Sequence, residues 1–149
     1  MEAVNLGTPC AECAGGVENH VLGTIHFGDF PPKNVYLSTN TQLAGAIDAY
    51  HVYAVEWSAE RIAWSVDGRR YAERRIGEWS TPASNDPHAP FDQPFHLILN
   101  LAIGGHLAEE RNSRGVTTTG FPRTMTVDWV RVWQRPPPPA APPAAGGAD

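Results

Sequence analysis

Long apolar runs, basic charge and cysteine are all scarce in this chain of 149 residues. No apolar run reaches the length of about 18 residues that a membrane-spanning helix needs, so we expect no membrane span. The formal net charge is −5 and both signs are mixed along the chain, which removes the basic footprint of a nucleic-acid-binding protein. The acidic, aromatic-bearing composition suits a neutral polymer as partner but does not identify one.

The cysteines number only two, Cys10 and Cys13, and two residues separate them. A single Cys-x-x-Cys lacks the second ligand pair of a structural zinc site. No βαβ pattern surrounds it, so it does not indicate a thioredoxin-type redox site. Two alternatives stay open, namely a local loop disulfide and a pair of free thiols.

The hydrophobic pattern alternates with a period of two residues, and no long helical stripe occurs, which predicts an all-β domain. The expected strands are short and turn-rich segments separate them, as in a β-sandwich. They span Glu2–Leu6, His20–Phe27, Tyr50–Trp57, Arg61–Val66, Arg69–Ile76, Phe95–Ile103 and Met125–Gln134. Between two of these strands, Asp67 and Gly68 supply the positive φ angles of a two-residue hairpin turn.

Two polar segments, residues 77–92 and 106–120, are expected to be loops. After them the composition changes abruptly, because residues 135–149 are rich in proline and alanine. Such a tract cannot build a core and favours extended polyproline II conformations. The sequence therefore predicts one domain over residues 1–134 and a spacer or tail over 135–149.

Two groups of motifs stand out by their order and spacing. The first group is HVYAVEW at 51–57, followed by RIAWSVDG at 61–68. The second is PFHLILNLAIGG at 94–105, followed by MTVDWVRVWQ at 125–134. Together they resemble glycoside hydrolase family 16, and most closely its laminarinase-like β-1,3-glucanases. The resemblance implies an antiparallel jelly roll of the concanavalin A-like type, here expected to be incomplete on its N-terminal side.

The family resemblance also implies a catalytic role for Glu2. The family carries its chemistry on one strand in the pattern Glu-x-Asp-x-x-Glu, and Met1-Glu2 matches the end of this pattern. Retaining glycosidases use one carboxylic acid as proton donor and a second carboxylate as nucleophile. Glu2 takes the place of the general acid/base, whereas the nucleophile and the intervening Asp would precede residue 1. We therefore expect an inactive fragment; a plain N-terminal glutamate is the alternative.

Polar residues on two expected strands are candidate sugar contacts. Thr24 and His26 share one strand face, and Val21, Gly23 and Ile25 take the other. If the Ile25 face packs inward, His26 faces an open cleft beside Glu2; an ordinary exposed histidine is the alternative. Asn100 lies in an apolar strand and needs partners for its amide, which a glucan hydroxyl or the neighbouring backbone supplies.

Aromatic rings bind the apolar faces of sugars, so the tryptophans were sorted by their surroundings. Trp64 lies with Ile62 and Val66 and is expected in the core. Trp57 is assigned to the wall of the cleft, with the core as the alternative. Trp79 lies in a polar loop and is the candidate stacking residue. All three assignments rest on the sequence neighbours alone.

Asp128 lies on an otherwise apolar strand face, where a carboxylate needs a cation or hydrogen-bond donors. The family resemblance implies a structural calcium at this place, completed by backbone carbonyls from earlier segments, and calcium prefers such oxygen ligands. No cofactor is required for the reaction itself.

The leading hypothesis is an endo-β-1,3- or β-1,3-1,4-glucanase domain that uses a retaining mechanism. Its partner is a β-glucan polysaccharide or oligosaccharide, with no nucleic acid and no membrane, and the chain is expected to be a monomer. A non-catalytic β-glucan-binding protein and a transglycosylase of the same family are the alternatives. The N-terminus lacks the features of a signal peptide, while the full-length protein is expected to be extracellular or periplasmic.

Overall fold

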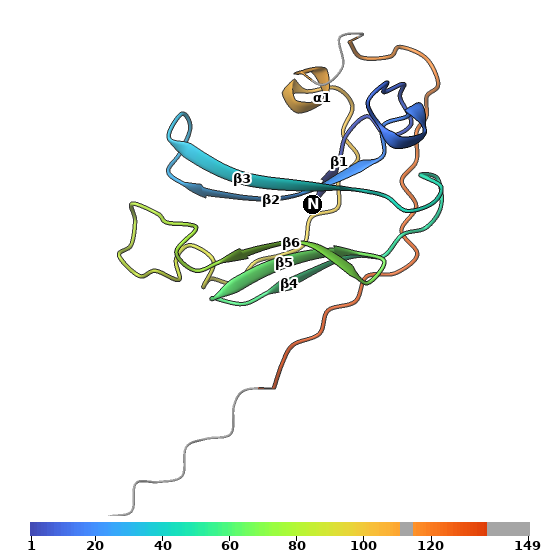
Figure 1. Cartoon of the computed structure of the whole chain (residues 1–149). Coiled ribbons are helices and arrows are strands. Elements are labelled where there is room, and N and C mark those ends of the chain that lie inside the picture. Colours follow the sequence, from blue (N-terminus) through green and yellow to red (C-terminus); the bar gives the residue numbers. More distant parts are fainter. Residues whose placement is uncertain (111–114, 137–149) are drawn as a thin grey trace, which may run out of the picture. The chain divides into compact units, whose positions relative to one another are not determined.

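A computed structural model describes residues 1–110 and 115–136. Two compact units divide the chain at Thr119, and all of the regular secondary structure within the described residues belongs to the first, Met1–Thr119. That unit holds two antiparallel sheets of three strands each (Figure 1). The expected all-β architecture is thus confirmed at the level of antiparallel sheets, while the closed jelly roll stays an expectation.

The first sheet has the order β1-β2-β3 and contains the strands Glu2–Ala3, His20–Gly28 and Asn34–Gln42. Its register pairs Glu2 with Leu22 on one side, and Leu22 with Asn40 on the other. Strand β3 was not expected from the sequence. Its residues Ser38–Thr41 include no apolar side chain, so the hydrophobic pattern did not reveal it.

The second sheet has the order β4-β5-β6 and contains the strands Tyr53–Trp57, Arg61–Val66 and Arg69–Arg75. The hairpin between the last two turns at Asp67 and Gly68, with φ angles of 51° and 76°, as predicted. Asp-Gly at a two-residue turn fixes the register of the flanking strands because both positions need positive φ. A β-bulge interrupts the ladder between Trp64 and Ser65.

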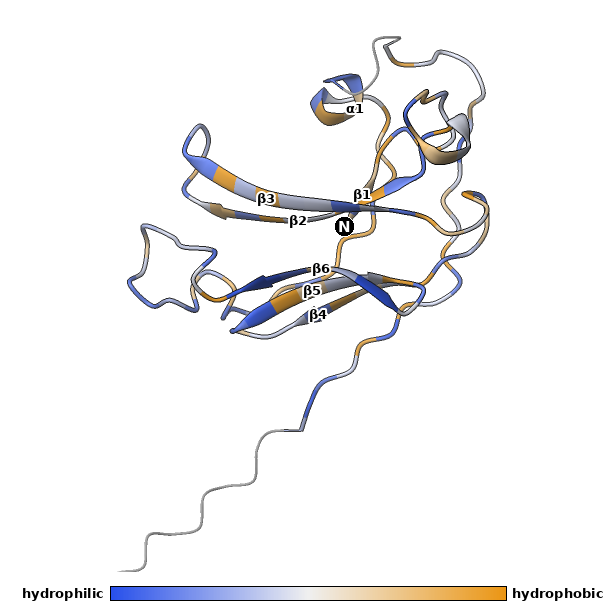
Figure 2. Ribbon diagram, viewed as in Figure 1, coloured by the Kyte–Doolittle hydropathy of each residue, from blue (hydrophilic) through white to orange (hydrophobic). Residues whose placement is uncertain are grey.

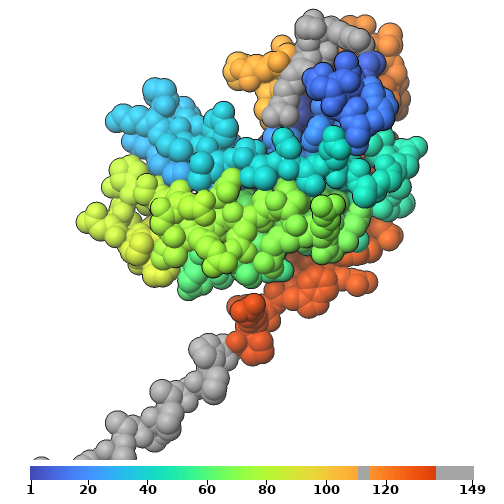
Figure 3. Space-filling view, in the orientation of Figure 1, coloured from blue at the N-terminus to red at the C-terminus, as the bar shows by residue number. Residues whose placement is uncertain are grey.

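The core lies between the two sheets and is built around the Trp64 indole, which is 3% exposed. Ile25 of β2 packs in the same cluster as Ile62, Trp64 and Ala72 of the second sheet. A second cluster joins Val21 to Val66 and Leu43. Atoms of β3 lie directly against β6 (Figure 3). The Ile25 face of β2 thus packs inward, which is the condition under which His26 faces outward.

Gly23 sets how closely the two sheets approach. A Cβ atom at this position would lie 2.9 Å from two indole carbons of Trp64 and 3.0 Å from the Tyr71 hydroxyl. Contacts under 3.0 Å are essentially not seen for real Cβ atoms. The backbone of β2 therefore rests on the Trp64 ring at the point between Leu22 and Thr24.

The outer face of the second sheet carries a network of charges. Glu56 accepts from Arg61 at 2.7 Å and from Arg70 at 3.0 Å. Glu73 pairs with the same two arginines, and also with Arg75. In Figure 2 this sheet shows alternating hydrophilic and hydrophobic segments, which fits a sheet with one charged and one apolar side.

Two hydrogen bonds of His51 link the segment before β4 to the β5–β6 turn. Its Nδ1 lies 2.8 Å from the Asp67 carboxylate and its Nε2 lies 2.9 Å from the Ala46 carbonyl. Both partners accept hydrogen bonds, so both ring nitrogens donate when the imidazole is protonated. These hydrogen bonds raise the pKa of His51, and the hydrogen bond from His51 lowers the pKa of Asp67.

Two strand predictions were wrong for the described structure. Residues 95–103 and 125–134 form no strand, and their apolar side chains are largely exposed; Leu99 and Val132, for example, are 60% and 78% exposed. Alternation marks a segment that suits a sheet, but a strand also needs a neighbour to complete its backbone hydrogen bonds. The segment expected to be a loop at 106–120 begins with the short helix α1, His106–Glu110.

The second unit, Gly120–Asp149, is described over residues 120–136 and holds no regular secondary structure there. Within these residues the Arg131 guanidinium lies over the Trp129 ring, 4.6 Å from its centroid. Most of the predicted tail, 137–149, lies outside the described residues. Among the residues that are described, no helix is long and apolar enough to cross a membrane.

Candidate active site

Glu2 is an exposed side chain on β1, and its strand register decides which way it points. Opposite residues of an antiparallel pair project to the same side of the sheet. Because Glu2 pairs with Leu22, it lies on the same side as Thr24 and His26, away from the core. The structure therefore places Glu2, Thr24 and His26 on one face, as the sequence predicted.

Strand β3 extends this face. In the register of β2 and β3, Asn40 lies opposite Leu22, Ser38 opposite Thr24 and Tyr36 opposite His26. We call this surface the polar face. Its members are Glu2, Thr24, His26, Tyr36, Ser38 and Asn40.

Two cross-strand contacts organise the polar face. The Thr24 and Ser38 hydroxyl oxygens lie 2.9 Å apart and share a hydrogen bond. Next to them, the rings of His26 and Tyr36 lie 5.8 Å apart, centroid to centroid, and are tilted by 40°. The Tyr36 side chain is 63% exposed. The polar face thus offers hydroxyl groups, an imidazole and an open aromatic ring on the same side of the sheet as one carboxylic acid.

The polar face carries a single carboxylate. The remaining strand positions that project to the same side are His20, Leu22, Asn34 and Gln42, and none of them is acidic. Hydrolysis with retention needs a second carboxylate at about 5–5.5 Å from the first. The described strands β1, β2 and β3 do not supply it on this face.

Comparison with known proteins identifies the family of the chain. The family model for glycosyl hydrolases family 16 matches residues 12–131. This chain belongs to glycosyl hydrolase family 16. The match begins beyond β1, so the role of Glu2 rests on its sequence motif and on its position in the sheet.

The relatives of this family 16 chain include enzymes and binding proteins. A glucan endo-1,3-beta-glucosidase A1 from Niallia circulans is 39% identical over 83% of the chain, and a beta-glucanase from Rhodothermus marinus is 37% identical over 78%. A beta-1,3-glucan-binding protein from Penaeus monodon is 30% identical over 55% of the chain. The aligned parts cover 18%, 36% and 27% of these proteins. No solved structure matches the chain significantly.

The tryptophan predictions for this family 16 chain have different outcomes. Trp64 lies in the core, as predicted. Trp79 was expected to be an exposed stacking ring, but it is 4% exposed and packs edge-on against Phe91 at 5.1 Å. That prediction was wrong because burial against Phe91 satisfies an apolar ring even in a polar stretch of sequence.

Trp57 lies on the second sheet, so the structure does not bring it to the polar face. It pairs with Ile62 in the register of β4 and β5. Its side chain is 46% exposed, its Nε1 donates to the Phe91 carbonyl at 2.8 Å, and its ring packs edge-on against Phe95 at 5.3 Å. A role in sugar binding there stays a prediction.

Asn100 and Asp128 lie outside the two sheets. Asn100 is exposed in a segment without a strand, and its contact with a sugar stays a prediction. Asp128 is exposed in the second unit. Within the described part of the chain it belongs to no group of three metal-ligating side chains. A calcium site at Asp128 stays a prediction, and we derive no step that depends on calcium.

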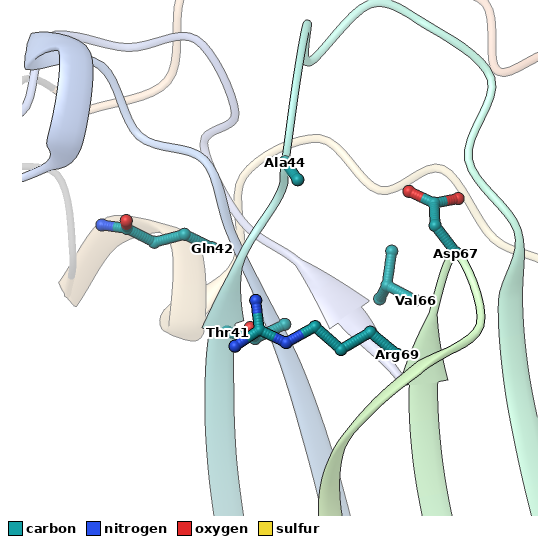
Figure 4. Close-up of a pocket in the computed structure, with 6 residues that line it drawn as sticks. All are labelled: Thr41, Gln42, Ala44, Val66, Asp67 and Arg69. Atoms are coloured by element: carbon teal, nitrogen blue, oxygen red, sulfur yellow. The ribbon is translucent and has the colours of Figure 1, made fainter.

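A pocket of about 230 Å³ lies apart from these residues (Figure 4). Its lining combines the end of β3 with the β5–β6 hairpin and consists of Thr41, Gln42, Ala44, Val66, Asp67 and Arg69. None of the predicted site residues takes part in it. Sequence reasoning also missed Tyr36, Ser38 and Asn40, for which the β-branched and aromatic composition of Val35–Thr41 was the available signal.

Proposed function

We propose that this chain supplies the general acid/base and part of the sugar-binding surface of a β-glucan hydrolase that retains anomeric configuration. The observation that supports the proposal is the pairing of Glu2 with Leu22, which puts the acid on the same side of the sheet as the Thr24–Ser38 hydroxyl pair and the Tyr36 ring. The proposed substrates are β-1,3- or mixed β-1,3-1,4-glucans. In support, one relative is named as a glucan endo-1,3-beta-glucosidase and another as a beta-glucanase.

In this proposal Glu2 protonates the oxygen of the leaving sugar while the bond to C1 breaks. The Thr24–Ser38 pair hydrogen-bonds a sugar hydroxyl, and the Tyr36 ring packs on the apolar face of a glucose unit. In the family pattern that Glu2 matches, the nucleophilic carboxylate would precede residue 1. The chain by itself is therefore expected to bind laminarin oligosaccharides without cleaving them.

Two measurements on the purified chain test this. Reducing-sugar release from laminarin should stay at background. Turnover that disappears in Glu2→Gln would contradict the proposal, because it would require a nucleophile within the chain. Titration with laminarin oligosaccharides should show saturable binding that Tyr36→Ala weakens. Tyr50→Ala is the matched control, because Tyr50 is 71% exposed and lies away from the polar face.

A non-catalytic glucan-binding protein is the second candidate. It is favoured by the Penaeus monodon relative and by the single carboxylate on the polar face. Chemical rescue separates the two. With azide and an aryl β-glucan oligosaccharide, azide attacks C1, the bond to the aryl oxygen breaks, and Glu2 protonates that oxygen. A glycosyl azide that Glu2→Gln no longer produces supports the hydrolase. Binding without any such product supports the binding protein.

A further inference from the structure

Four metal-ligating side chains converge on the loop between β1 and β2. One ligand atom each from Cys10, Cys13 and Glu18 lies within 4.8 Å of the other two. His20 is the fourth, with its Nδ1 4.0 Å from the Cys13 sulfur and 2.8 Å from a Glu18 oxygen. The second ligand pair that the Cys-x-x-Cys lacks in the sequence is thus present in space.

The loop holds these ligands in place by backbone contacts that do not depend on the cysteine side chains. The Cys10 amide donates to the Gly16 carbonyl at 3.0 Å, and the Gly16 amide donates to the Cys13 carbonyl at 2.9 Å. Pro9 and Val17 form a β-bridge at the base of the turn. The His20 amide also donates to the Glu18 carboxylate at 2.9 Å, which fixes that carboxylate beside the turn.

In the structure Cys10 and Cys13 form a disulfide, which confirms one of the two alternatives left open by the sequence. Disulfide sulfurs have no thiolate charge and are poor ligands. A dithiol reductant breaks the S–S bond by transferring two electrons and two protons and itself becomes a disulfide. Two thiols then stand at the turn, and a metal ion that binds them displaces their two protons.

We propose that the reduced chain binds one Zn²⁺ through Cys10, Cys13, Glu18 and His20. A tetrahedral site with Zn–S near 2.3 Å and Zn–N near 2.05 Å places a sulfur and a nitrogen ligand about 3.6 Å apart. The Cys13 sulfur is already 4.0 Å from the His20 nitrogen and 3.9 Å from a Glu18 oxygen. These two distances therefore need to shorten by only a few tenths of an ångström. The His20 nitrogen and the Glu18 oxygen, now 2.8 Å apart, must separate to about 3.4 Å, and the two sulfurs must separate to about 3.8 Å.

The His20 ring keeps its proton when the metal binds. In the disulfide form the Nδ1–H donates to Glu18. In the zinc form Nδ1 binds the metal and the proton moves to Nε2, so the imidazole stays neutral. Two thiolates and one carboxylate give the metal centre a net charge of −1. Thiolate and imidazole ligands at four-coordinate geometry select zinc over magnesium and calcium.

Cobalt provides the first test, because Co²⁺ in a tetrahedral thiolate site shows sulfur-to-metal charge transfer and intense visible bands. The full chain is reduced with a phosphine, desalted without oxygen and titrated with Co²⁺ and then Zn²⁺. We expect one Co²⁺ per chain, displaced by one Zn²⁺, and no such spectrum from the oxidised chain. A spectrum without sulfur charge transfer, or equal binding by the oxidised chain, would overturn the proposal.

Variants assign the ligands. Cys13→Ser should reduce the charge-transfer intensity per bound Co²⁺ to about half, because one of the two thiolates remains. Glu18→Gln and His20→Ala should each raise the Kd for Zn²⁺ at least about 10-fold, the lower end of the effect of an outer-shell partner. Glu12→Gln, which changes a carboxylate in the same loop outside the cluster, is the matched control and should leave the Kd unchanged. Unchanged affinity in both Glu18→Gln and His20→Ala would refute the four-ligand site.

X-ray absorption on the zinc-loaded unmodified chain avoids any dependence on how the variants fold. The site should show two sulfur neighbours at about 2.3 Å and two nitrogen or oxygen neighbours at about 2.0–2.2 Å. A shell of four sulfurs would show that two chains share the metal, and a shell without sulfur would show adventitious binding. Either result contradicts the proposal.

Discussion

Replacing Gly23 with alanine should destabilise the protein, although alanine ordinarily suits a strand better than glycine. The added methyl would lie 2.9 Å from two carbons of the Trp64 ring, against 3.4–4 Å for ordinary contact. The distance between the methyl and the ring must therefore increase by about half an ångström, either because the ring moves or because the sheets separate. The Trp64 ring is 3% exposed and packs against Ile25 and Ile62, so it has little room to move.

The expected magnitude follows from two opposed effects. Overpacking a core costs about 1–3 kcal/mol. Removing the flexibility of glycine from a strand returns about 0.5–1 kcal/mol. At the middle of both ranges the net loss in the free energy of unfolding is about 1 kcal/mol, which corresponds to a fall in Tm of roughly 2–4 °C for a chain of about 150 residues.

Urea unfolding followed by tryptophan fluorescence measures this loss, because Trp64 and Trp79 are both buried. The midpoint should fall while the slope m is unchanged. Tyr71→Phe removes the hydroxyl that the added methyl would meet at 3.0 Å. Gly23→Ala should therefore lower the free energy of unfolding less in a Tyr71→Phe background than in the unmodified protein. A Gly23→Ala protein at least as stable as the unmodified one would refute the close contact between β2 and Trp64.

Three further predictions concern the second sheet and its turn. Tyr71→Phe should stabilise the protein by about 1 kcal/mol in urea unfolding, because the buried Tyr71 hydroxyl has no hydrogen-bond partner in the structure and burial raises its pKa to about 12. The His51–Asp67 pair should stabilise most between about pH 3.9 and 6.5, the ordinary pKa values of the two groups. The raised pKa of His51 means that its contribution fades as pH rises through that pKa, and the lowered pKa of Asp67 means that its contribution fades as pH falls through that pKa. The free energy of unfolding of the unmodified protein and of His51→Asn, measured with urea at several pH values, should therefore differ less at alkaline pH. A difference that does not change with pH would contradict a stabilising role of the His51–Asp67 pair. Glu56→Gln should cost at most about 1 kcal/mol, and less in high salt, because its carboxylate is exposed to solvent.

Local signals predicted the β5–β6 hairpin well. Its first strand has the expected bounds Arg61–Val66, and Asp67 and Gly68 form the turn, because the turn chemistry and the alternation of Ile62, Trp64 and Val66 act within a few residues. The same alternation in residues 95–103 predicted a strand that the structure does not form. A neighbouring strand decides that outcome, and a single segment of sequence does not contain this information.

The candidate site was predicted in part. The face shared by Thr24 and His26 follows from the period of a strand, and its orientation follows from Ile25 in the core. The partners Tyr36, Ser38 and Asn40 depend on the register between β2 and β3, which spans residues far apart in the sequence. The cluster of Cys10 with its three partners could not be predicted either. Glu18 and His20 come after a turn, at a spacing from the cysteines that matches no regular metal-binding pattern.

The ion pairs on the outside of the second sheet indicate how readily their residues can be substituted. Each of the two carboxylates is shared, so the loss of Arg61 leaves Glu56 with Arg70 and leaves Glu73 with Arg70 and Arg75. No single arginine is indispensable to this arrangement. Replacements at these three positions should accumulate freely over evolutionary time and in random libraries, whereas the opposite side of the same strands admits few. Substitutions are thus expected to be tolerated on the charged side of the sheet and not on its apolar side.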